Sequence, residues 1–152
     1  MTAPQLPSDA ACSLEGDAPA LVPPGEYDLR FDYYDTATMF GCAPKLVLWF
    51  TIITMGPYFD VVKLARYYNA TRLIGKPQRN GRFKVGYKSD FLREYARLFR
   101  APSRLDRISM TEFTRHIVIG RARTVTQGAD QKGIPEGLRY SVLDALTGIR
   151  ER

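Results

Sequence analysis

The 152-residue sequence predicts a mainly β domain, in which one helix separates the third and fourth of five strands. Three observations support this fold class. Residues 25–33 alternate between apolar and charged side chains, residues 45–53 form an almost continuous apolar run, and residues 91–99 carry apolar side chains at helical spacing. With 45% hydrophobic residues, the chain is long enough for one domain with its own core.

The first 24 residues differ in composition from the rest of the chain. They are acidic, contain five prolines and show no apolar period, so we expect a disordered leader at 1–24 and a single folded domain at 25–152. Residues 1–44 hold seven acids and one base, whereas residues 45–152 hold 21 bases and nine acids. An acidic leader of this kind either folds back and competes with a bound polyanion or is only solvated.

The first two strands follow from their apolar patterns. The alternation at 25–33 is typical of a half-buried strand. Its inward positions are Tyr27, Leu29, Phe31 and Tyr33. After a turn at 41–44, the run at 45–53 is rich in β-branched and aromatic residues, which favours a strand that is covered on both faces or lies at a barrel wall.

The third strand returns after a hairpin that Met55-Gly56-Pro57 closes, and we expect it at 61–68. Side chains alternate along a strand, so Tyr67 and Tyr68 must point to opposite faces. We therefore expect one of these tyrosines to lie outside, beside Lys63 or Arg66.

Residues 75–82 combine proline, Asn-Gly and two further glycines, so they cannot continue a strand or a helix. We expect a basic loop of the kind that moves and contacts ligands. A helix then begins with Ser89 as N-cap and Asp90 at the positive end of the helix dipole, and it ends before Pro102. Its apolar face consists of Phe91, Leu92, Tyr95, Leu98 and Phe99.

Two strands complete the predicted domain. A short helical turn at 109–113 precedes the fourth strand at 116–126, and a polar turn at 127–133 leads to the fifth strand at 138–143. In the fourth strand, Arg121 and Arg123 share a face with two isoleucines that we place in the core. A buried arginine without a partner is costly, so these two are expected either to be exposed or to pair with an acid such as Asp28 or Asp32.

This order of elements is that of the OB-fold, a five-stranded and partly open barrel with its helix between the third and fourth strands. A mixed α+β sheet would accommodate the same elements. Residues 25–143 also resemble the small OB-fold single-stranded DNA-binding proteins of phages and mobile elements. The resemblance rests on Gly25-Glu26-Tyr27, Phe50-Thr51-Ile52, Gly56-Pro57-Tyr58-Phe59 and Arg66-Tyr67-Tyr68.

The resemblance implies a barrel that binds single strands without sequence preference during replication, recombination or transfer. One feature departs from the pattern. Bacterial single-strand binders usually end in an acidic tail that recruits partners, whereas this chain ends Ile149-Arg150-Glu151-Arg152. Recruitment through the C-terminus is therefore in doubt.

Charge and aromatic residues give an independent argument for the same function. Residues 61–125 hold sixteen Lys and Arg against four acids, a net charge of +12, together with eight Tyr and Phe. Phosphate neutralisation combined with base stacking suits single-stranded nucleic acid. The alternative is a solubilising positive surface over aromatic residues that are simply core.

The candidate nucleic-acid-binding residues come from these basic and aromatic segments. For phosphate contacts we select nine cations, which are Lys63, Arg66, Lys76, Arg79, Arg82, Lys84, Lys88, Arg121 and Arg123. For base stacking we select four aromatic residues, which are Trp49, Tyr67, Phe83 and Tyr87. For Trp49, burial in the core is the competing expectation.

Catalysis, cofactor binding and metal binding find little support in the sequence. Asp28, Asp32 and Asp35 could gather a divalent ion for nuclease chemistry, but alternation along a strand explains two of them as a solvent face. His116 is the single histidine and opens a predicted strand, so we expect a strand-end residue rather than a base or ligand. Cys12 and Cys42 make neither a disulfide framework nor a zinc motif, and no nucleophile elbow or P-loop occurs. The longest apolar run has eight residues, which argues against secretion and membrane insertion and favours the cytoplasm.

We therefore expect a non-enzymatic, sequence-tolerant single-stranded DNA-binding protein of a phage or mobile element. RNA in place of DNA, a homo-oligomer, and replication or recombination proteins as partners remain open. The alternative is a protein-interaction module of a mobile element, a regulator or inhibitor that acts through its basic loop.

Overall fold

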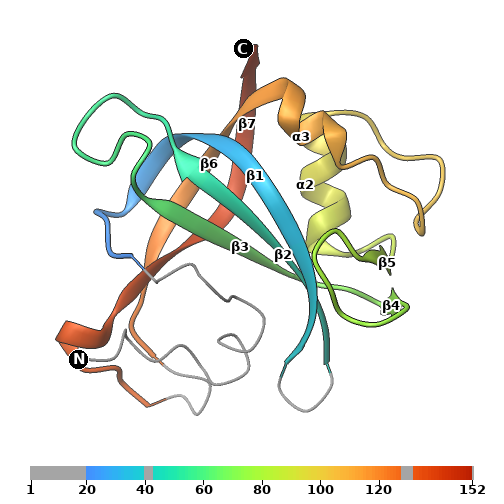
Figure 1. The fold of residues 1–152 in the computed structure, drawn as a ribbon, viewed down its shortest axis with the longest axis horizontal. Coiled ribbons are helices and arrows are strands. Elements are labelled where there is room, and N and C mark those ends of the chain that lie inside the picture. The colour runs from blue at the N-terminus through green and yellow to red at the C-terminus, as the bar shows by residue number, and fades with distance from the viewer. Residues whose placement is uncertain (1–19, 40–42, 128–131, 152) are drawn as a thin grey trace.

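The computed structural model describes residues 20–39, 43–127 and 132–151, which form a mainly β domain (Figure 1). One five-stranded antiparallel sheet has the strand order β3-β2-β1-β6-β7. Its strands are β1 (Gly25–Met39), β2 (Ala43–Ile52), β3 (Lys63–Asn69), β6 (His116–Val125) and β7 (Tyr140–Glu151). The helix α2 (Asp90–Leu98) follows β3 and precedes β6, so the predicted order of strands and helix is confirmed.

The central strand β1 is long enough to pair with two neighbouring strands along different parts of its length. Its first residues, Gly25 to Leu29, pair with β6, and the remainder pairs with β2 as far as Met39. The sheet coils so strongly that its two edge strands, β3 and β7, lie side by side (Figure 1).

A β-bulge in β1 separates Phe31 from Tyr33. Phe31 lies opposite Phe50 and packs in the main core, whereas Tyr33 lies opposite Trp49 on the other face of the sheet. The extra residue, Asp32, reverses the alternation of side chains. The prediction that Tyr33 shares the inward face with Phe31 is therefore wrong.

The main core lies between the inner face of the sheet and two helices, α2 and α3 (Thr111–Arg115). Ser89 caps α2 as predicted, because its Oγ accepts a hydrogen bond from the Leu92 N–H at 3.2 Å. Phe91 and Phe113 are buried in this core, and each contacts neighbouring rings at centroid distances between 5.0 and 6.4 Å. The predicted apolar face of the helix is confirmed.

Strand β2 is buried on both faces, as the sequence predicted. Its inward residues belong to the main core. Val47 and Trp49 point to the opposite face and pack in a second apolar cluster. The other buried members of that cluster are Ala37, Met39, Ala65, Tyr140 and Val142.

The basic loop at 75–82 is held in place rather than free. It connects β4 (Arg72–Ile74) and β5 (Arg82–Lys84), a two-stranded ribbon that the sequence did not predict. The Thr36 N–H donates to the Gln78 carbonyl at 3.0 Å, and the Asn80 N–H donates to the Tyr34 carbonyl at 2.9 Å. A Cβ at Gly81 would lie 2.3 Å from Thr36 Oγ1, so only glycine permits this close approach.

Strand β6 presents the opposite face to the core from the one predicted. Val118, Gly120 and Ala122 are buried, whereas Arg121 and Arg123 share the outer face with the two isoleucines. Strand β7 is also longer than predicted, and it begins after a short 3₁₀ helix at Glu136–Leu138. Part of the predicted turn at 127–133 lies outside the described residues, as do residues 41 and 42 of the turn at 41–44, while Ala43 and Pro44 already belong to β2.

The packed chain begins before Gly25. Val22 is buried and its N–H donates to Ser141 Oγ at 2.9 Å, while the Ser141 N–H donates to the Ala20 carbonyl at 2.7 Å. The remainder of the predicted leader, residues 1–19, lies outside the described residues. No helix in the described part of the chain is long and apolar enough to cross a lipid bilayer.

Candidate nucleic-acid interface

The outer face of β1, β2 and β3 brings together residues that are far apart in the sequence. Tyr33, Trp49 and Ala65 lie side by side in one row across the three strands. In neighbouring rows, Tyr67 lies opposite Val47, and Lys63 lies opposite Thr51. Strand alternation alone puts Lys63 and Tyr67 on this face, as the sequence predicted.

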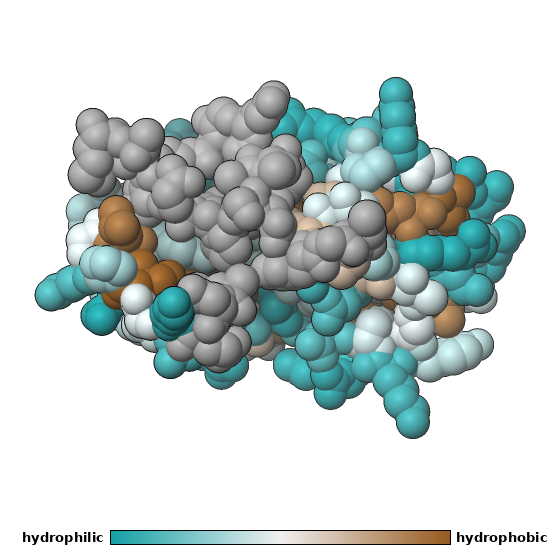
Figure 2. Space-filling view, turned by 90° about the horizontal axis from the view of Figure 1, so that it is seen from below, coloured by the Kyte–Doolittle hydropathy of each residue, from teal (hydrophilic) through white to brown (hydrophobic). Residues whose placement is uncertain are grey.

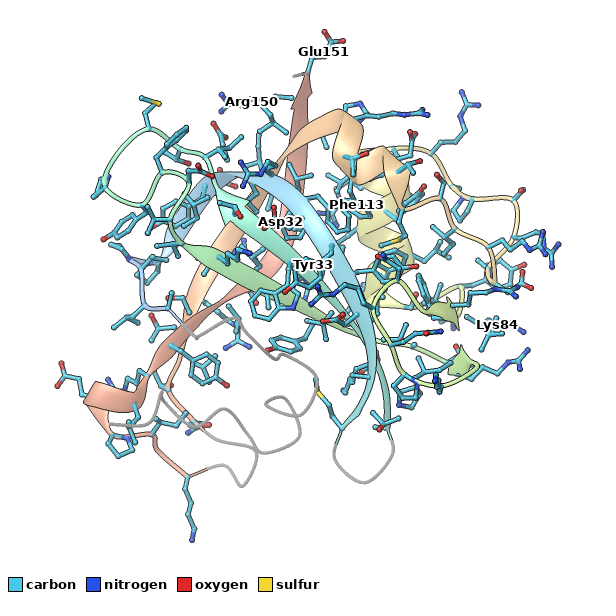
Figure 3. The ribbon with its side chains drawn as sticks, viewed as in Figure 1. Asp32, Tyr33, Lys84, Phe113, Arg150 and Glu151 are labelled. Carbon is cyan, nitrogen blue, oxygen red and sulfur yellow. The ribbon has the colours of Figure 1, made fainter. Side chains whose placement is uncertain are left out.

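Two cations approach the Tyr33 ring from different elements. The Arg79 guanidinium lies 3.8 Å from the ring centroid, and Lys63 Nζ lies 5.9 Å from it. The Trp49 ring lies beside the same tyrosine, with centroids 6.4 Å apart. We call Tyr33, Trp49, Lys63, Tyr67 and Arg79 the outer-face cluster; Figure 3 shows Tyr33 on this face and Phe113 beside the helices.

Arg79 reaches the cluster because the loop that carries it is fastened to β1. Its Nε also lies 3.4 Å from Oδ1 of the buried Asp35. Even so, 56% of the Arg79 side chain remains exposed. The geometry therefore holds a cation over an aromatic ring while leaving it accessible to an anion.

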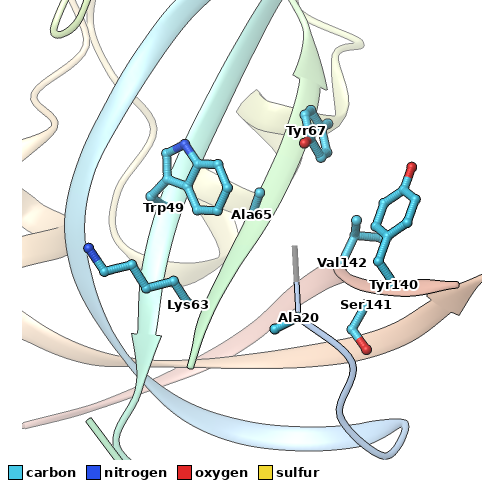
Figure 4. A pocket seen from close by; sticks show the side chains of 8 residues that line it. All are labelled: Ala20, Trp49, Lys63, Ala65, Tyr67, Tyr140, Ser141 and Val142. Atoms are coloured by element: carbon cyan, nitrogen blue, oxygen red, sulfur yellow. The ribbon is translucent and has the colours of Figure 1, made fainter. Parts of the chain in front are cut away.

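The members of the cluster differ in exposure, with Trp49 buried, Tyr33, Lys63 and Tyr67 half-buried, and Arg79 exposed. Trp49 is 3% exposed, which confirms the competing expectation that it is buried. Burial raises the pKa of the Tyr67 hydroxyl, and the nearby Tyr140 adds to this effect. A small hollow of about 10 Å³, room for about one water, lies between these side chains (Figure 4).

The buried indole N–H of Trp49 has no hydrogen-bond acceptor within the described part of the chain. A buried donor without an acceptor is rare and costly, and such groups often belong to functional sites. An acceptor supplied by a ligand or a water would remove that cost.

Arg66, a predicted binding residue, is instead part of a buried ion pair. Arg66 is 12% exposed at its side chain and pairs with the buried Glu94, Nε to Oε1 at 3.2 Å. The same oxygen accepts from the Tyr68 hydroxyl at 2.7 Å and from the Leu146 N–H at 2.9 Å. Glu94 thus ties α2 to both edge strands, so the assignment of Arg66 to the binding site is not supported.

Phe83 also belongs to the core rather than to a stacking surface. Its ring is buried and meets the rings of Tyr34 and Phe91 edge to face, at 5.9 and 5.6 Å. The neighbouring Lys84 points away from the domain (Figure 3). Alternation in β5 therefore separates a core aromatic residue from the cations on either side of it.

Arg121 and Arg123 are exposed and share one acid on the neighbouring strand. Both pair with Asp144 of β7, at 2.9 and 3.4 Å. The acids that the sequence suggested have other partners, because Asp28 pairs with Arg150 and Asp32 pairs with Arg30. Arg123 lies opposite Val142 of β7, a member of the second apolar cluster, and its charge offsets part of the rise that burial causes in the pKa of Tyr140.

The remaining predicted residues lie on the ribbon and in the turn before α2. Four of them are exposed and one, Lys84, is half-buried. These residues are Lys76, Arg82, Lys84, Tyr87 and Lys88. None of the four cations among them forms an ion pair with another described residue. Hydrophilic side chains cover much of the described surface in Figure 2, with hydrophobic ones gathered in separate patches.

Sequence reasoning missed Tyr33 and Glu94. No local signal in the sequence predicts that Tyr33 lies on the outer face. The apolar alternation of the sequence continues through Tyr33, and only the bulge in β1 reverses the direction of its side chain. Glu94 had a signal, since it lies three residues after Phe91 on the apolar face of the predicted helix. An acid at such a position needs a buried partner, which here is Arg66.

His116 opens β6 as predicted, with its ring against Phe99 at 5.4 Å and its Nδ1 3.0 Å from the Glu112 carbonyl. Within the described ranges, no group of three or more His, Cys, Asp and Glu side chains could hold a metal ion. No family model, curated protein or solved structure matches this chain. Function must therefore be inferred from the site itself.

Proposed function

We propose that this chain binds single-stranded DNA without sequence preference, and that its sheet is an OB-fold-like barrel. The observation that carries the proposal is the outer-face cluster, in which Arg79 and Lys63 lie over the Tyr33 ring. Cations for phosphates and aromatic faces for bases are the two components of sequence-tolerant single-strand binding.

The arrangement of strands supports the barrel. β1 pairs with both β2 and β6, β3 lies beside β7, and the helix α2 connects the third main strand to the fourth. This is the connectivity expected of a five-stranded, partly open barrel. In OB-folds the face of the second and third strands binds oligonucleotides, and β2 and β3 supply three members of the cluster.

Single strands suit the cluster better than a duplex. The aromatic rings are set among side chains of the sheet, so a base must leave a stack to reach them. The exposed cations of the ribbon, such as Lys76 and Arg82, extend the positive surface beyond the cluster. They would neutralise phosphates on either side of a bound base.

Trp49 offers a direct test because it is the only tryptophan in the sequence. Single-stranded oligonucleotides of about 15–30 nucleotides should change its fluorescence and bind more tightly than the matching duplex. With roughly four to six phosphates neutralised, log K should fall against log salt with a slope of about −3 to −4. Equal affinity for duplex and single strand, or a flat salt dependence, would exclude the proposal.

A second candidate function is protein interaction, which the β2–β3 hairpin favours. Met55 is 83% exposed and Val61 is 75% exposed, and Phe59 is also exposed nearby. Exposed apolar side chains that lie close together often mark a contact with another protein. If this candidate were correct, purified protein would carry no nucleic acid by its absorbance ratio and would not bind the oligonucleotides.

A further inference from the structure

A second hollow lies on the helix side of β1, away from the outer-face cluster. It measures about 370 Å³, which is within the size range of small-molecule sites. Tyr34 of β1 and Arg82 of β5 form two of its walls, and the segment between α2 and α3 forms the third through Arg107, Ile108 and Ser109. We call it the Arg82 hollow.

Hydrogen bonds fix these three walls relative to one another. The Asn80 N–H donates to the Tyr34 carbonyl at 2.9 Å and joins the ribbon to β1. The Val85 N–H donates to the Leu105 carbonyl at 3.1 Å, and the Tyr95 hydroxyl donates to the Ser109 carbonyl at 2.7 Å. The hollow is therefore a preformed feature of the fold, which lowers the cost of ordering on binding.

The charge in the hollow is positive, with two arginines and one acid in its lining. The side chains of Arg82 and Arg107 form no ion pair and no hydrogen bond with the described residues, although the charge of Arg107 helps to lower the pKa of Asp106. The one acid in the lining, Asp106, is held by Arg104 through two hydrogen bonds of 3.0 and 2.8 Å. Two guanidinium groups are thus left to bind an anion.

The apolar part of the lining suits a flat ring. Tyr34 is half-buried and rests against the edge of Phe83, so its ring has a fixed orientation. Its hydroxyl has no hydrogen-bond partner in the part of the chain that the structure describes. An aromatic ring beside free guanidinium groups can hold a base while the arginines hold a phosphate.

We propose that the Arg82 hollow binds a nucleoside phosphate, with the phosphate on Arg82 and Arg107 and the base against Tyr34. The ligand is either a free mononucleotide or the phosphorylated end of a strand, since both present the same groups. This binding does not depend on single-strand binding at the outer-face cluster, which lies on the opposite side of β1.

The test is a titration of the full chain, followed by the backbone amide NMR signals of Ile108 and Ser109. Thymidine 5′-monophosphate should shift these signals saturably and bind at least about tenfold more tightly than thymidine or inorganic phosphate alone. The double variant Arg82→Gln and Arg107→Gln should weaken that binding by about tenfold or more. The matched control is Arg100→Gln, an exposed arginine outside the lining, which should leave it unchanged.

Oligonucleotides with and without a 5′-terminal phosphate distinguish the two sources. A gain in affinity from the terminal phosphate that the double variant loses would identify a strand end, whereas mononucleotide binding without that gain would identify a free nucleotide. The proposal is overturned if neither probe responds, or if the response persists in the double variant while its thermal midpoint shows that it is folded. Trp49 fluorescence reports on the outer face separately, so failure here leaves the proposed function open to its own test.

Discussion

Two groups of the same composition, each an arginine, a tyrosine and a buried acid, lie on opposite faces of the sheet. On the inner face, Arg66 lies 4.2 Å from the Tyr68 ring and pairs with Glu94. On the outer face, Arg79 lies 3.8 Å from the Tyr33 ring and pairs with Asp35.

The two groups differ in access to solvent and in the number of elements they join. Arg66 is 12% exposed, and its acid also binds β7, whereas Arg79 is 56% exposed. An ion pair removed from water is costly to break because the remaining charge is left buried, while a cation left in water can exchange its partner for a phosphate. The same side chains therefore serve stability on one face and are available for binding on the other.

The largest effect is expected from breaking the inner group. Glu94→Ala leaves the Arg66 charge and the Leu146 N–H without their partner, so the free energy of unfolding should fall by about 3–5 kcal/mol. Urea denaturation measures the change. Glu112→Ala, which removes an acid from an exposed pair with Arg115, should cost no more than about 1 kcal/mol. Similar losses in both variants would contradict a special role for the inner group.

Removing the ring of the outer group should affect binding more than folding. Tyr33→Ala should weaken single-strand binding by about 1–3 kcal/mol without changing the salt slope, because stacking releases no counterions. Fluorescence anisotropy of a labelled oligonucleotide measures both quantities. Tyr87→Ala is the matched control, since this exposed tyrosine lies in the turn before α2 and outside the cluster. If Tyr87→Ala has the larger effect, the stacking surface lies elsewhere.

A smaller effect is expected at Arg79, where two substitutions distinguish the contribution of its charge from that of its planar guanidinium group. Arg79→Gln should make the salt slope shallower by about 0.7, the value for one phosphate contact on a single strand. Arg79→Lys keeps the charge but loses the planar contact with Tyr33, so its slope should equal that of the unmodified chain. The slopes are obtained by measuring the affinity of each variant for a single-stranded oligonucleotide from low to moderate salt. A slope unchanged in both variants would remove Arg79 from the interface.

The smallest effect concerns the acidic residues at the start of the sequence. Ala20 lines the hollow beside Trp49 and Lys63, so residues 1–19 join the described chain next to the outer-face cluster. They hold three acids and no Lys or Arg. Their removal should tighten single-strand binding slightly at low salt and have no effect at high salt, where such charges are screened. Unchanged affinity at low salt would show that these acids do not compete with the strand.

The five strands of the main sheet, the helix α2 and several of their local patterns could be predicted from the sequence, whereas the β4–β5 ribbon could not. The burial of β2 on both faces, the Ser89 cap, the inward face of α2 and the alternation of β3 are all confirmed. Each depends on the period of a single segment or on a cap a few residues away. Of the predicted binding residues, Lys63 and Tyr67 reached the outer face for this reason.

Which of these residues share a site depends on the packing of the whole domain. The bulge at Asp32 turned Tyr33 outward, the hydrogen bonds to β1 placed Arg79 over it, and the helix α2 brought Glu94 to Arg66. Arg66 and Arg79 carry the same charge, and no periodicity distinguishes a buried cation from an exposed one. Arg66 contacts Glu94, 28 positions away, and Arg79 contacts Tyr33, 46 positions away. Strand register and packing set these contacts, so the pattern of a single segment cannot predict them.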